Sequence, residues 1–452
     1  MALLPRFFDS VRSRKVDLNP VEEGVVNIYF CGPTVYNHVH LGNLRPAVTF
    51  DLLTRFLRAC GYRTRVVSNY TDIDDKIIAE ARRERVSEKA LAEHYIEAYE
   101  KTIAPLDLLP LDDHPRASLK ISKMIDFIQV LIQRGYAYRA GEDVFFSVGN
   151  IEDYGAISHM DTEANLAGIR VETQETKRDP RDFALWKLTA DEGVKFDSPF
   201  GEGRPGWHTE CVTMIKDSFA TPVIDIHGGG FDLKFPHHEN ERAQSLGYDS
   251  TPLANIWMHV GFLNASEGEK MSKSLGNVIL AKDVLEKYSG NAVRIFFYRT
   301  HYRAPLSYSD ETLKQAEEMA SRFESTYSRL TAKIALLEGE LESSVLTSST
   351  AFEETMRYLA DDLNTANALS AVERETRRAL TLLRSEKTPL KDLVEAASSL
   401  KSLLDLLGFR VEKRVLSEEE RRLYMEYVEA RINRDFEASD RLRAILMEKG
   451  IL

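Results

Sequence analysis

The pattern of hydrophobic and polar positions near the start of the chain predicts a strand, a helix and a second strand. The run "VVNIYF" (residues 25–30) is continuous, β-branched and aromatic, which is typical of a buried strand. After the turn-forming loop "CGPTVYN", residues 47–61 carry apolar side chains at helical spacing, and "TRVVSN" (64–69) again has the composition of a strand. Strand, helix and strand in this order form a βαβ unit, so we predict a parallel sheet with a ligand site over the carboxyl ends of its strands.

The pattern changes further along the chain. From Asp310 onward the segments are highly charged, poor in glycine and helical in period. The stretch between the two regions, at about residues 110–200, mixes short strand-like and irregular pieces. We therefore predict an α/β domain over residues 1–309 with an insertion at about 110–200, followed by an α-helical domain over residues 310–452.

Composition narrows the class of protein. A chain of 452 residues can form two or three domains with cores of their own. Three cysteines are too few and too far apart for a disulfide framework, and the net charge of -12 argues against a surface coated with basic residues for nucleic acid. Nucleic acid would need a local basic groove. No apolar run approaches the length of a membrane span, so we expect a cytoplasmic protein with no membrane partner.

Two short motifs suit phosphate chemistry. "HLGN" (residues 40–43) falls where the first loop meets the first helix, and a helix N-terminus favours an anion. "KMSKSLGN" (270–277) places two lysines in a glycine-ended stretch that suits a polyphosphate. Taken singly, the first motif is compatible with an ordinary helix start, and the second is compatible with a solvated lysine loop.

Taken together, and in this order, the two motifs resemble the "HIGH" and "KMSKS" signatures of class I aminoacyl-tRNA synthetases. The blocks "YFCGPTVYNHVHLGN", "NYTDIDDKI", "GRPGWHTEC", "DIHGGGFDLKFPHHENE", "DDLNTANAL" and "ARINRDFEASDRLR" are similar to the cysteinyl-tRNA synthetase family, along nearly the whole chain. The resemblance implies a Rossmann-like catalytic domain followed by an α-helical domain that binds tRNA and its anticodon.

In that family a zinc ion lies in the amino-acid pocket, and the resemblance implies one zinc ion per chain, with the ligands Cys31, Cys211, His237 and Glu241. The residue types agree with this assignment, because two sulfurs, one nitrogen and one oxygen suit zinc. Pro236 suits a first helical position, and His237 and Glu241 would then share one face of the helix. His238 would point about 100° away, so we expect it to pack beside the site instead of ligating the metal.

The resemblance also implies the remaining site residues and the reaction. ATP and L-cysteine would form cysteinyl-adenylate, and the cysteinyl group would pass to the 3' end of tRNA(Cys), with Mg²⁺ accompanying ATP. The implied catalytic residues are His40, Asn43, Lys270 and Lys273, the implied ATP-binding residues are His40, Gly42, Asn43, Gly230, Asp232 and Lys273, and the implied cysteine-pocket residues are Thr71 and Trp207. The glycines at 228–230 would let the nucleotide approach the backbone.

Three alternatives use similar motifs. One is a ligase that joins cysteine to an amino sugar in mycothiol synthesis, another is a paralogue without catalytic activity, and the third is a nucleotidyltransferase with a "HIGH"-type loop. The long helical domain favours tRNA as the acceptor, and we expect the enzyme to be a monomer. The resemblance leaves anticodon reading open, since family members usually continue past the "GI" of "LMEKGIL" into a short segment that helps to read it.

Overall fold

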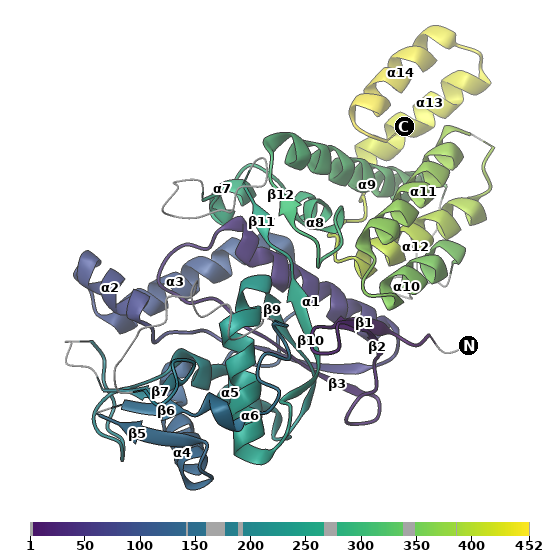
Figure 1. Ribbon diagram of the computed structural model, residues 1–452. Coiled ribbons are helices and arrows are strands. Elements are labelled where there is room, and N and C mark those ends of the chain that lie inside the picture. The colour runs from purple at the N-terminus through teal and green to yellow at the C-terminus, as the bar shows by residue number, and fades with distance from the viewer. Residues whose placement is uncertain are drawn as a thin grey trace. The chain divides into compact units, whose positions relative to one another are not determined.

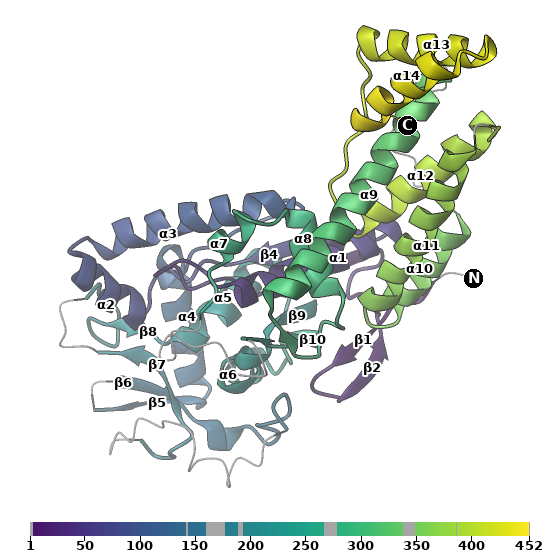
Figure 2. The ribbon, with the colours of Figure 1, turned by 90° about the horizontal axis from the view of Figure 1, so that it is seen from above.

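The computed structural model describes residues 3–141, 143–159, 177–188, 193–265, 278–337, 349–385 and 387–451. The chain forms two compact units (Figures 1 and 2). Unit 1 comprises Met1–Ala104, Leu108–Val284 and Tyr302–Ser307, and unit 2 comprises Pro105–Asp107, Leu285–His301 and Tyr308–Leu452.

Unit 1 has both strands and helices. Its elements are β1 (Arg6–Asp9), β2 (Arg14–Asp17), β3 (Val25–Phe30), α1 (Leu41–Ala59), β4 (Arg63–Ser68), α2 (Asp75–Glu84), α3 (Glu88–Ile103), α4 (Ile121–Gln133), β5 (Ala137–Ala140), β6 (Asp143–Phe146), β7 (Phe183–Lys187), β8 (Arg204–Pro205), α5 (Trp207–Phe219), β9 (Ile224–Gly230), α6 (Glu239–Asp249), β10 (Ala254–Val260), β11 (Leu263–Asn264), α7 (Ala281–Leu285) and β12 (Leu306–Ser307).

The central sheet of unit 1 is parallel, with the strand order β10-β9-β3-β4. The chain adds β4 on one side of β3 and then returns to add β9 and β10 on the other side. The strand order therefore reverses between β3 and β9, and the carboxyl ends of two such strands diverge to leave a crevice where ligands bind in open α/β sheets. The predicted βαβ unit is confirmed, and α1 begins at Leu41, so its N-terminus lies within "HLGN".

Helices cover both faces of this sheet. Neighbouring residues of β3 point to opposite faces, so its side chains pack against helices on both sides. Phe30 stacks on Phe50 of α1, with ring centroids 4.9 Å apart. Tyr29 belongs instead to the core that contains Ile128 of α4 and Val212 of α5. All six residues of β3 are buried, as its continuous apolar sequence predicts.

Two smaller sheets extend unit 1. Strands β5, β6, β7 and β8 form an antiparallel sheet in that order, within and just beyond the predicted insertion. Strands β1 and β2 form an antiparallel hairpin at the start of the chain. The hairpin is joined to β10, because the Ser10 amide donates to the Trp257 carbonyl and the Trp257 amide donates to Asp9 Oδ1, both at 3.0 Å.

Unit 2 is helical. Its helices are α8 (Gly290–Tyr298), α9 (Asp310–Leu336), α10 (Thr350–Ala360), α11 (Thr365–Arg384), α12 (Leu390–Leu406), α13 (Glu418–Ile432) and α14 (Phe436–Glu448). Helices α9, α11 and α12 pack against one another, and α13 and α14 form a helical hairpin. Serine caps begin several of these helices, for example Ser309 before α9 and Ser417 before α13.

The boundary of unit 2 differs from the boundary predicted at residues 309 and 310. Residues 285–301 belong with the helical unit because α8 packs along α9 and all nine of its residues are buried. Arg294 of α8 is fully buried and donates from Nε to the Leu106 carbonyl at 2.8 Å, which ties residues 105–107 to the same unit. No helix within the described ranges is both long enough and apolar enough to cross a membrane.

Candidate active site and metal-ligand cluster

A pocket of about 350 Å³ lies at the carboxyl ends of β3, β4, β9 and β10. We call it the sheet-edge pocket. The structure gathers most of the predicted site residues around it: Cys31, His40, Gly42, Asn43, Thr71, Trp207, Cys211, Gly230, Asp232 and His237. Lys270 and Lys273 lie outside the described residues. The pocket is therefore at the crevice that the strand order predicts.

Four potential metal ligands lie beside the pocket, and we call them the four-donor cluster. Cys31, Cys211 and His237 line the pocket, whereas Glu241 is fully buried and does not line it. One donor atom from each of Cys31, Cys211, His237 and Glu241 lies within 4.8 Å of the other three. The sulfur atoms of Cys31 and Cys211 are 3.8 Å apart, and His237 Nε2 is 2.7 Å from Glu241 Oε1. Cys31 follows β3, whereas Cys211 lies near the start of α5, so the fold joins residues that are far apart in the sequence.

The buried position of the cluster changes the protonation of its members. Burial raises the pKa of Cys31 well above its usual value, while a hydrogen bond from Cys31 lowers the pKa of Cys211 to about 6. Burial alone would lower the pKa of His237, but the Glu241 carboxylate and Cys211 raise it to about 10. At neutral pH the cluster thus holds a thiolate, a carboxylate and an imidazolium. A divalent cation would replace protons in this set, and its two-sulfur, one-nitrogen, one-oxygen donors fit zinc.

Regular helix α6 begins later than predicted. Pro236 lies inside a five-residue π-helical turn, Lys234–His238, in which Phe235 has extended backbone angles, and α6 begins at Glu239. His237 and Glu241 nevertheless meet, as the spacing of four residues predicts.

His238 lies closer to the cluster than its predicted direction suggests. Its Nε2 is 3.3 Å from Cys31 Sγ, and a second set of possible ligands consists of Cys31, His227, His238 and Glu241. The two sets share Cys31 and Glu241. The irregular turn before α6 explains the difference, because the 100° spacing of an ideal helix does not apply within it.

Further histidines, which were not predicted as site residues, surround the cluster. His227 Nε2 is 2.6 Å from Glu241 Oε2, so the carboxylate is held by two imidazoles. His208 lies 3.0 Å from His237 between their Nδ1 atoms, and His259 lies 2.8 Å from His238. Buried imidazoles orient groups by hydrogen bonding. Both histidines lie in buried strands: His259 in β10 directly precedes the pocket-lining Val260, and His227 in β9 lies three residues before Gly230.

Trp207 and Thr71, the residues predicted to form the cysteine pocket, both line the sheet-edge pocket. The Trp207 ring is stacked on His237, with centroids 4.3 Å apart, and it is 38% exposed although it is large and apolar. Thr71 is buried and accepts a hydrogen bond from Asn69 at 3.1 Å, while Asn69 also accepts one from the Gly32 amide. Trp207 thus forms one wall beside the four-donor cluster, and Thr71 lies on a fixed loop across the same pocket.

The N-terminus of α1 opens on the other part of the pocket. His40 is its N-cap residue, and the His40 backbone amide donates to Asn43 Oδ1 at 3.1 Å. Asn43 therefore has a capping role in the protein, in addition to the predicted contact with phosphate. A side chain at Gly42 would contact the His40 ring at 3.0 Å, so this glycine leaves room for the imidazole.

Close neighbours within the protein leave little room for a side chain at the three glycines at the end of β9. A Cβ atom at Gly228 would lie 2.3 Å from the Met258 carbonyl oxygen and 2.5 Å from the Phe50 ring. A Cβ atom at Gly229 would meet Leu233, whereas one at Gly230 would meet the side chain of Asp232 at the pocket lining. Packing between β9, β10 and α1 thus explains Gly228, and only Gly230 lines the pocket.

Gly228→Ala should lower the free energy of unfolding of unit 1 by about 1–3 kcal/mol, because the added methyl group overpacks a backbone contact. Gly149→Ala is the matched control, since a Cβ atom there has no neighbour within 4 Å, and we expect a change within about 0.5 kcal/mol. Urea unfolding followed by tryptophan fluorescence measures both, because all three tryptophans, Trp186, Trp207 and Trp257, lie in unit 1. Equal midpoints for the two variants would contradict the packing explanation.

Comparison with known proteins agrees with this geometry. Residues 17–318 match the family model described as tRNA synthetases class I (C) catalytic domain. The chain is 40% identical to the cysteine–tRNA ligase of Halalkalibacterium halodurans, over 98% of this chain and 96% of the relative. It is also 40% identical to the cysteine–tRNA ligase of Geobacillus thermodenitrificans, over 99% and 96% of the two chains.

A solved structure shows the same fold at low sequence identity. The methionyl-tRNA synthetase of Mycobacterium tuberculosis, in complex with methionyl-adenylate, is similar with a TM-score of 0.59 and 18% identity, over 85% of this chain and 89% of that one. The parallel sheet with its crevice and the match along nearly the whole length of the two bacterial relatives lead to one assignment. The chain belongs to the cysteine–tRNA ligase family of class I aminoacyl-tRNA synthetases.

Proposed function

We propose that this chain is a cysteine–tRNA ligase that activates L-cysteine with ATP and transfers it to tRNA(Cys), acting as a monomer in the cytoplasm. The observation that carries the proposal is the four-donor cluster beside a pocket whose lining includes the N-terminus of α1. The curated relatives, which match nearly the whole chain, support the same activity.

The four-donor cluster supports zinc as the metal and cysteine as the amino acid. Zinc held by Cys31, Cys211, His237 and Glu241 would supply a soft site for the thiol of cysteine, for which the hydroxyl of serine is a much poorer ligand. An apolar cavity alone distinguishes groups of this size by only about 1–3 kcal/mol. We infer that Trp207 and Thr71 hold the remaining parts of the amino acid beside the cluster.

Activation needs the cysteine carboxylate and the α-phosphate of ATP to meet between the cluster and α1. The carboxylate oxygen attacks the phosphorus, and pyrophosphate leaves with the electrons of the broken P–O bond. Positioning and fixed donors accelerate such transfers. We assign the phosphate contacts to His40, Asn43 and the amides at the start of α1, the ribose contact to Asp232 beside Gly230, and the pyrophosphate contacts to Lys270 and Lys273, with Mg²⁺ accompanying ATP.

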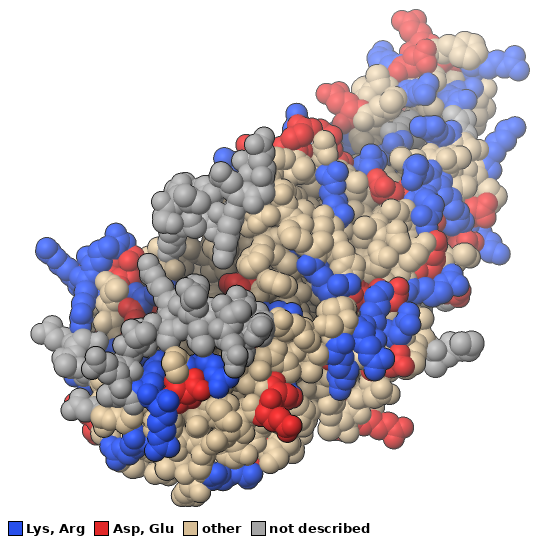
Figure 3. Space-filling view, viewed as in Figure 1, with Lys and Arg blue, Asp and Glu red and all other residues tan. Residues whose placement is uncertain are grey.

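The second step transfers the activated acyl group to the terminal ribose hydroxyl of tRNA, which displaces AMP from the carbonyl carbon. We assign tRNA binding to unit 2. Six arginines are exposed on α13, on α14 and between them: Arg421, Arg422, Arg431, Arg434, Arg441 and Arg443. Acidic side chains lie among the basic ones on the face of unit 2 seen in Figure 3. Individual cationic contacts to phosphates therefore fit this unit better than a continuous basic surface does.

Charging of unfractionated tRNA with labelled cysteine tests the proposal, with labelled serine as the competing amino acid. We expect cysteine to be attached to tRNA and serine to be rejected. Cysteine-dependent pyrophosphate exchange without charging of tRNA would overturn the assignment of the acceptor, and an amino sugar would then be the acceptor to test. Absence of exchange as well would overturn the catalytic assignment and favour a paralogue without activity.

Lys273→Ala should slow adenylate formation by about 10- to 100-fold and change the affinity for cysteine by less than about threefold, because the lysine would hold the leaving pyrophosphate. Stopped-flow or single-turnover pyrophosphate exchange measures the first effect, and equilibrium dialysis with labelled cysteine measures the second. The neighbouring Lys282→Ala is the control and should leave both values unchanged. An unaffected activation rate would remove Lys273 from the mechanism.

A further inference from the structure

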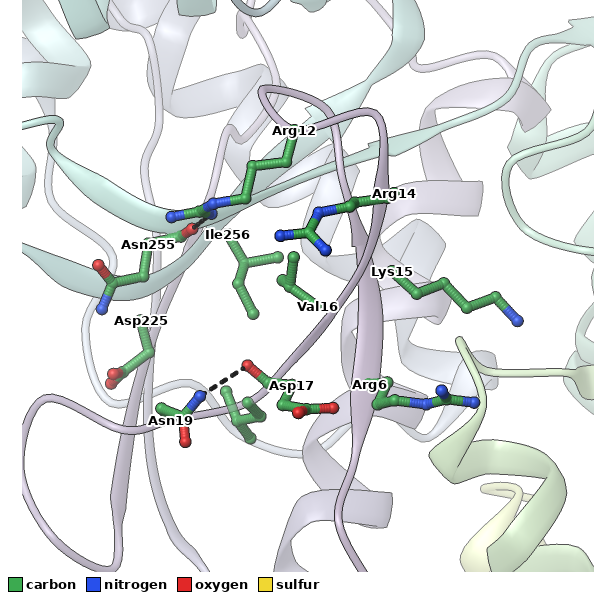
Figure 4. Close-up of a pocket in the computed structure, with 11 residues that line it drawn as sticks. Arg6, Arg12, Arg14, Lys15, Val16, Asp17, Asn19, Asp225, Asn255 and Ile256 are labelled. Atoms are coloured by element: carbon green, nitrogen blue, oxygen red, sulfur yellow. Dashed lines mark hydrogen bonds between the residues drawn. The ribbon is translucent and has the colours of Figure 1, made fainter.

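A second pocket, of about 470 Å³, lies at the opposite end of the parallel sheet from the sheet-edge pocket (Figure 4). Its walls come from the β1–β2 hairpin and from Asp225 and Ile256, which lie near the first residues of β9 and β10. Gly230 and Val260, at the last residues of the same strands, line the sheet-edge pocket. Each strand has seven residues, so roughly 20 Å separates the two pockets. We call this second pocket the hairpin pocket.

Two arginines form one wall of the hairpin pocket. Arg12 Nη1 donates to the Asn255 carbonyl at 2.8 Å and to Asp9 Oδ2 at 2.9 Å, which fixes its guanidinium at the rim. The Arg14 guanidinium makes no hydrogen bond or ion pair within the part of the chain that the structure describes. Figure 4 shows both guanidinium groups on the side occupied by Val16 and Ile256. Arg6 and Lys15 also line the pocket, but their long side chains point away from Val16 and Ile256 in Figure 4.

Two acidic residues, Asp17 and Asp225, line the pocket, and Asp225 at its base does not neutralise the arginines. Asp225 uses both carboxylate oxygens for backbone amides, Oδ1 for Val21 and Oδ2 for Asn27, each at 2.7 Å. A carboxylate that accepts two backbone hydrogen bonds in this way stabilises the fold. Arg12 is already ion-paired with Asp9, whereas Arg14 faces the open cavity without such a partner among the described residues, on a protein whose net charge is -12.

The rest of the lining is suited to a ligand that is only partly charged. The partly exposed Val16 side chain lies beside the buried Ile256 at the centre of the pocket in Figure 4, and Asn19 and Asn255 lie at its edge. Asn19 donates to the Asp17 carbonyl at 3.2 Å, so its amide is held in place while its carbonyl oxygen remains an acceptor. Apolar side chains suit the flat face of a base, and amide groups suit its edge or a ribose hydroxyl.

We propose that the hairpin pocket binds a nucleoside phosphate, with its phosphate on Arg14, beside the Arg12 guanidinium, and its base against Val16. Planar guanidinium groups bind phosphate oxygens in pairs, and Arg14 supplies donors that no other described group uses. The volume lies within the range of small-molecule sites and exceeds what an inorganic phosphate needs. This site is separate from the one at which ATP reacts.

Photolabelling of the full-length protein with radioactive 8-azido-ADP tests the proposal, because mapping of the labelled peptides separates the two pockets. We expect label on the peptides that carry the β1–β2 hairpin or the start of β10. Arg14→Ala should raise the half-saturating concentration for that label by at least about tenfold. Lys15→Ala is the matched control, since it removes the same charge from the next residue of β2, and it should change the value by less than about threefold.

Competitors define the ligand. Adenosine, which lacks phosphate, should not displace the label, and pyrophosphate should displace it at least about tenfold less well than ADP. Label confined to the sheet-edge peptides, or equal effects of Arg14→Ala and Lys15→Ala, would overturn the proposal. Pyrophosphate competing as well as ADP would overturn its nucleoside part. Thermal melting of both variants checks that an exposed substitution has left the fold intact.

Discussion

Cys211→Ser is expected to release the metal and to weaken the binding of cysteine while the binding of ATP persists. The substitution removes one of the two sulfur donors of the four-donor cluster and replaces it with a hydroxyl, a poor zinc ligand. Loss of a hydrogen-bonding neighbour of a ligand costs about 10- to 100-fold in metal affinity, so loss of a ligand should exceed about 100-fold. Cysteine, which would bind through its own sulfur, should lose affinity to a similar degree.

Elemental analysis of dialysed protein measures the metal, and the cysteine and ATP dependence of pyrophosphate exchange measures the substrates. Cys60→Ser is the matched control, since Cys60 caps the end of α1 and belongs to neither set of possible ligands among the described residues. It should keep one zinc ion per chain and wild-type values of KM. Unchanged metal content in Cys211→Ser would remove the four-donor cluster from the mechanism.

His40→Ala is expected to slow cysteine activation by about 100- to 1,000-fold, the usual effect of removing a donor aimed at the charge that develops in the transition state. His40 lies at the N-cap of α1 and lines the sheet-edge pocket, but it belongs to neither set of possible metal ligands. Zinc content and cysteine affinity should therefore stay within about twofold. The fall should appear in the maximal rate of pyrophosphate exchange and not in the KM for cysteine.

His38→Ala is the control for this prediction. His38 lies on the same loop and lines the same pocket, but its ring packs edge-on against Tyr95, with centroids 5.5 Å apart. We expect its activation rate to fall by less than about tenfold. Similar losses in both variants would indicate that the loop conformation, and not the His40 imidazole, accounts for the effect.

Much of the fold could be predicted from the sequence because local signals there agree with the tertiary structure. The continuous apolar run of β3, the amphipathic helix α1 and the start of β4 each have the pattern of the element that they form. The spacing of His237 and Glu241 predicted their meeting even though α6 starts later than expected. The boundary between the units was harder to predict, since α8 is buried on all sides and its sequence does not show which unit it packs in.

There is a physical reason why the histidines around the site could not be predicted from the sequence. His227 approaches Glu241 because β9 runs beside the turn before α6, and His259 approaches His238 from β10. Such contacts depend on tertiary packing between strands, which no periodicity encodes. The same is true of Gly228, whose missing side chain is explained by a carbonyl oxygen on the neighbouring strand and by a ring on α1.

The loop between β3 and α1 carries Cys31 at one end and His40 at the other, nine positions apart. In the proposed function, one short segment of backbone would contribute both to the choice of amino acid and to the reaction with ATP. Selectivity and turnover cannot be altered independently through this loop, because a shift that moves the sulfur also moves the imidazole. Engineering the fold to accept another amino acid is therefore better directed at Cys211, His237 and Trp207, which belong to other elements and leave the phosphate-binding end in place.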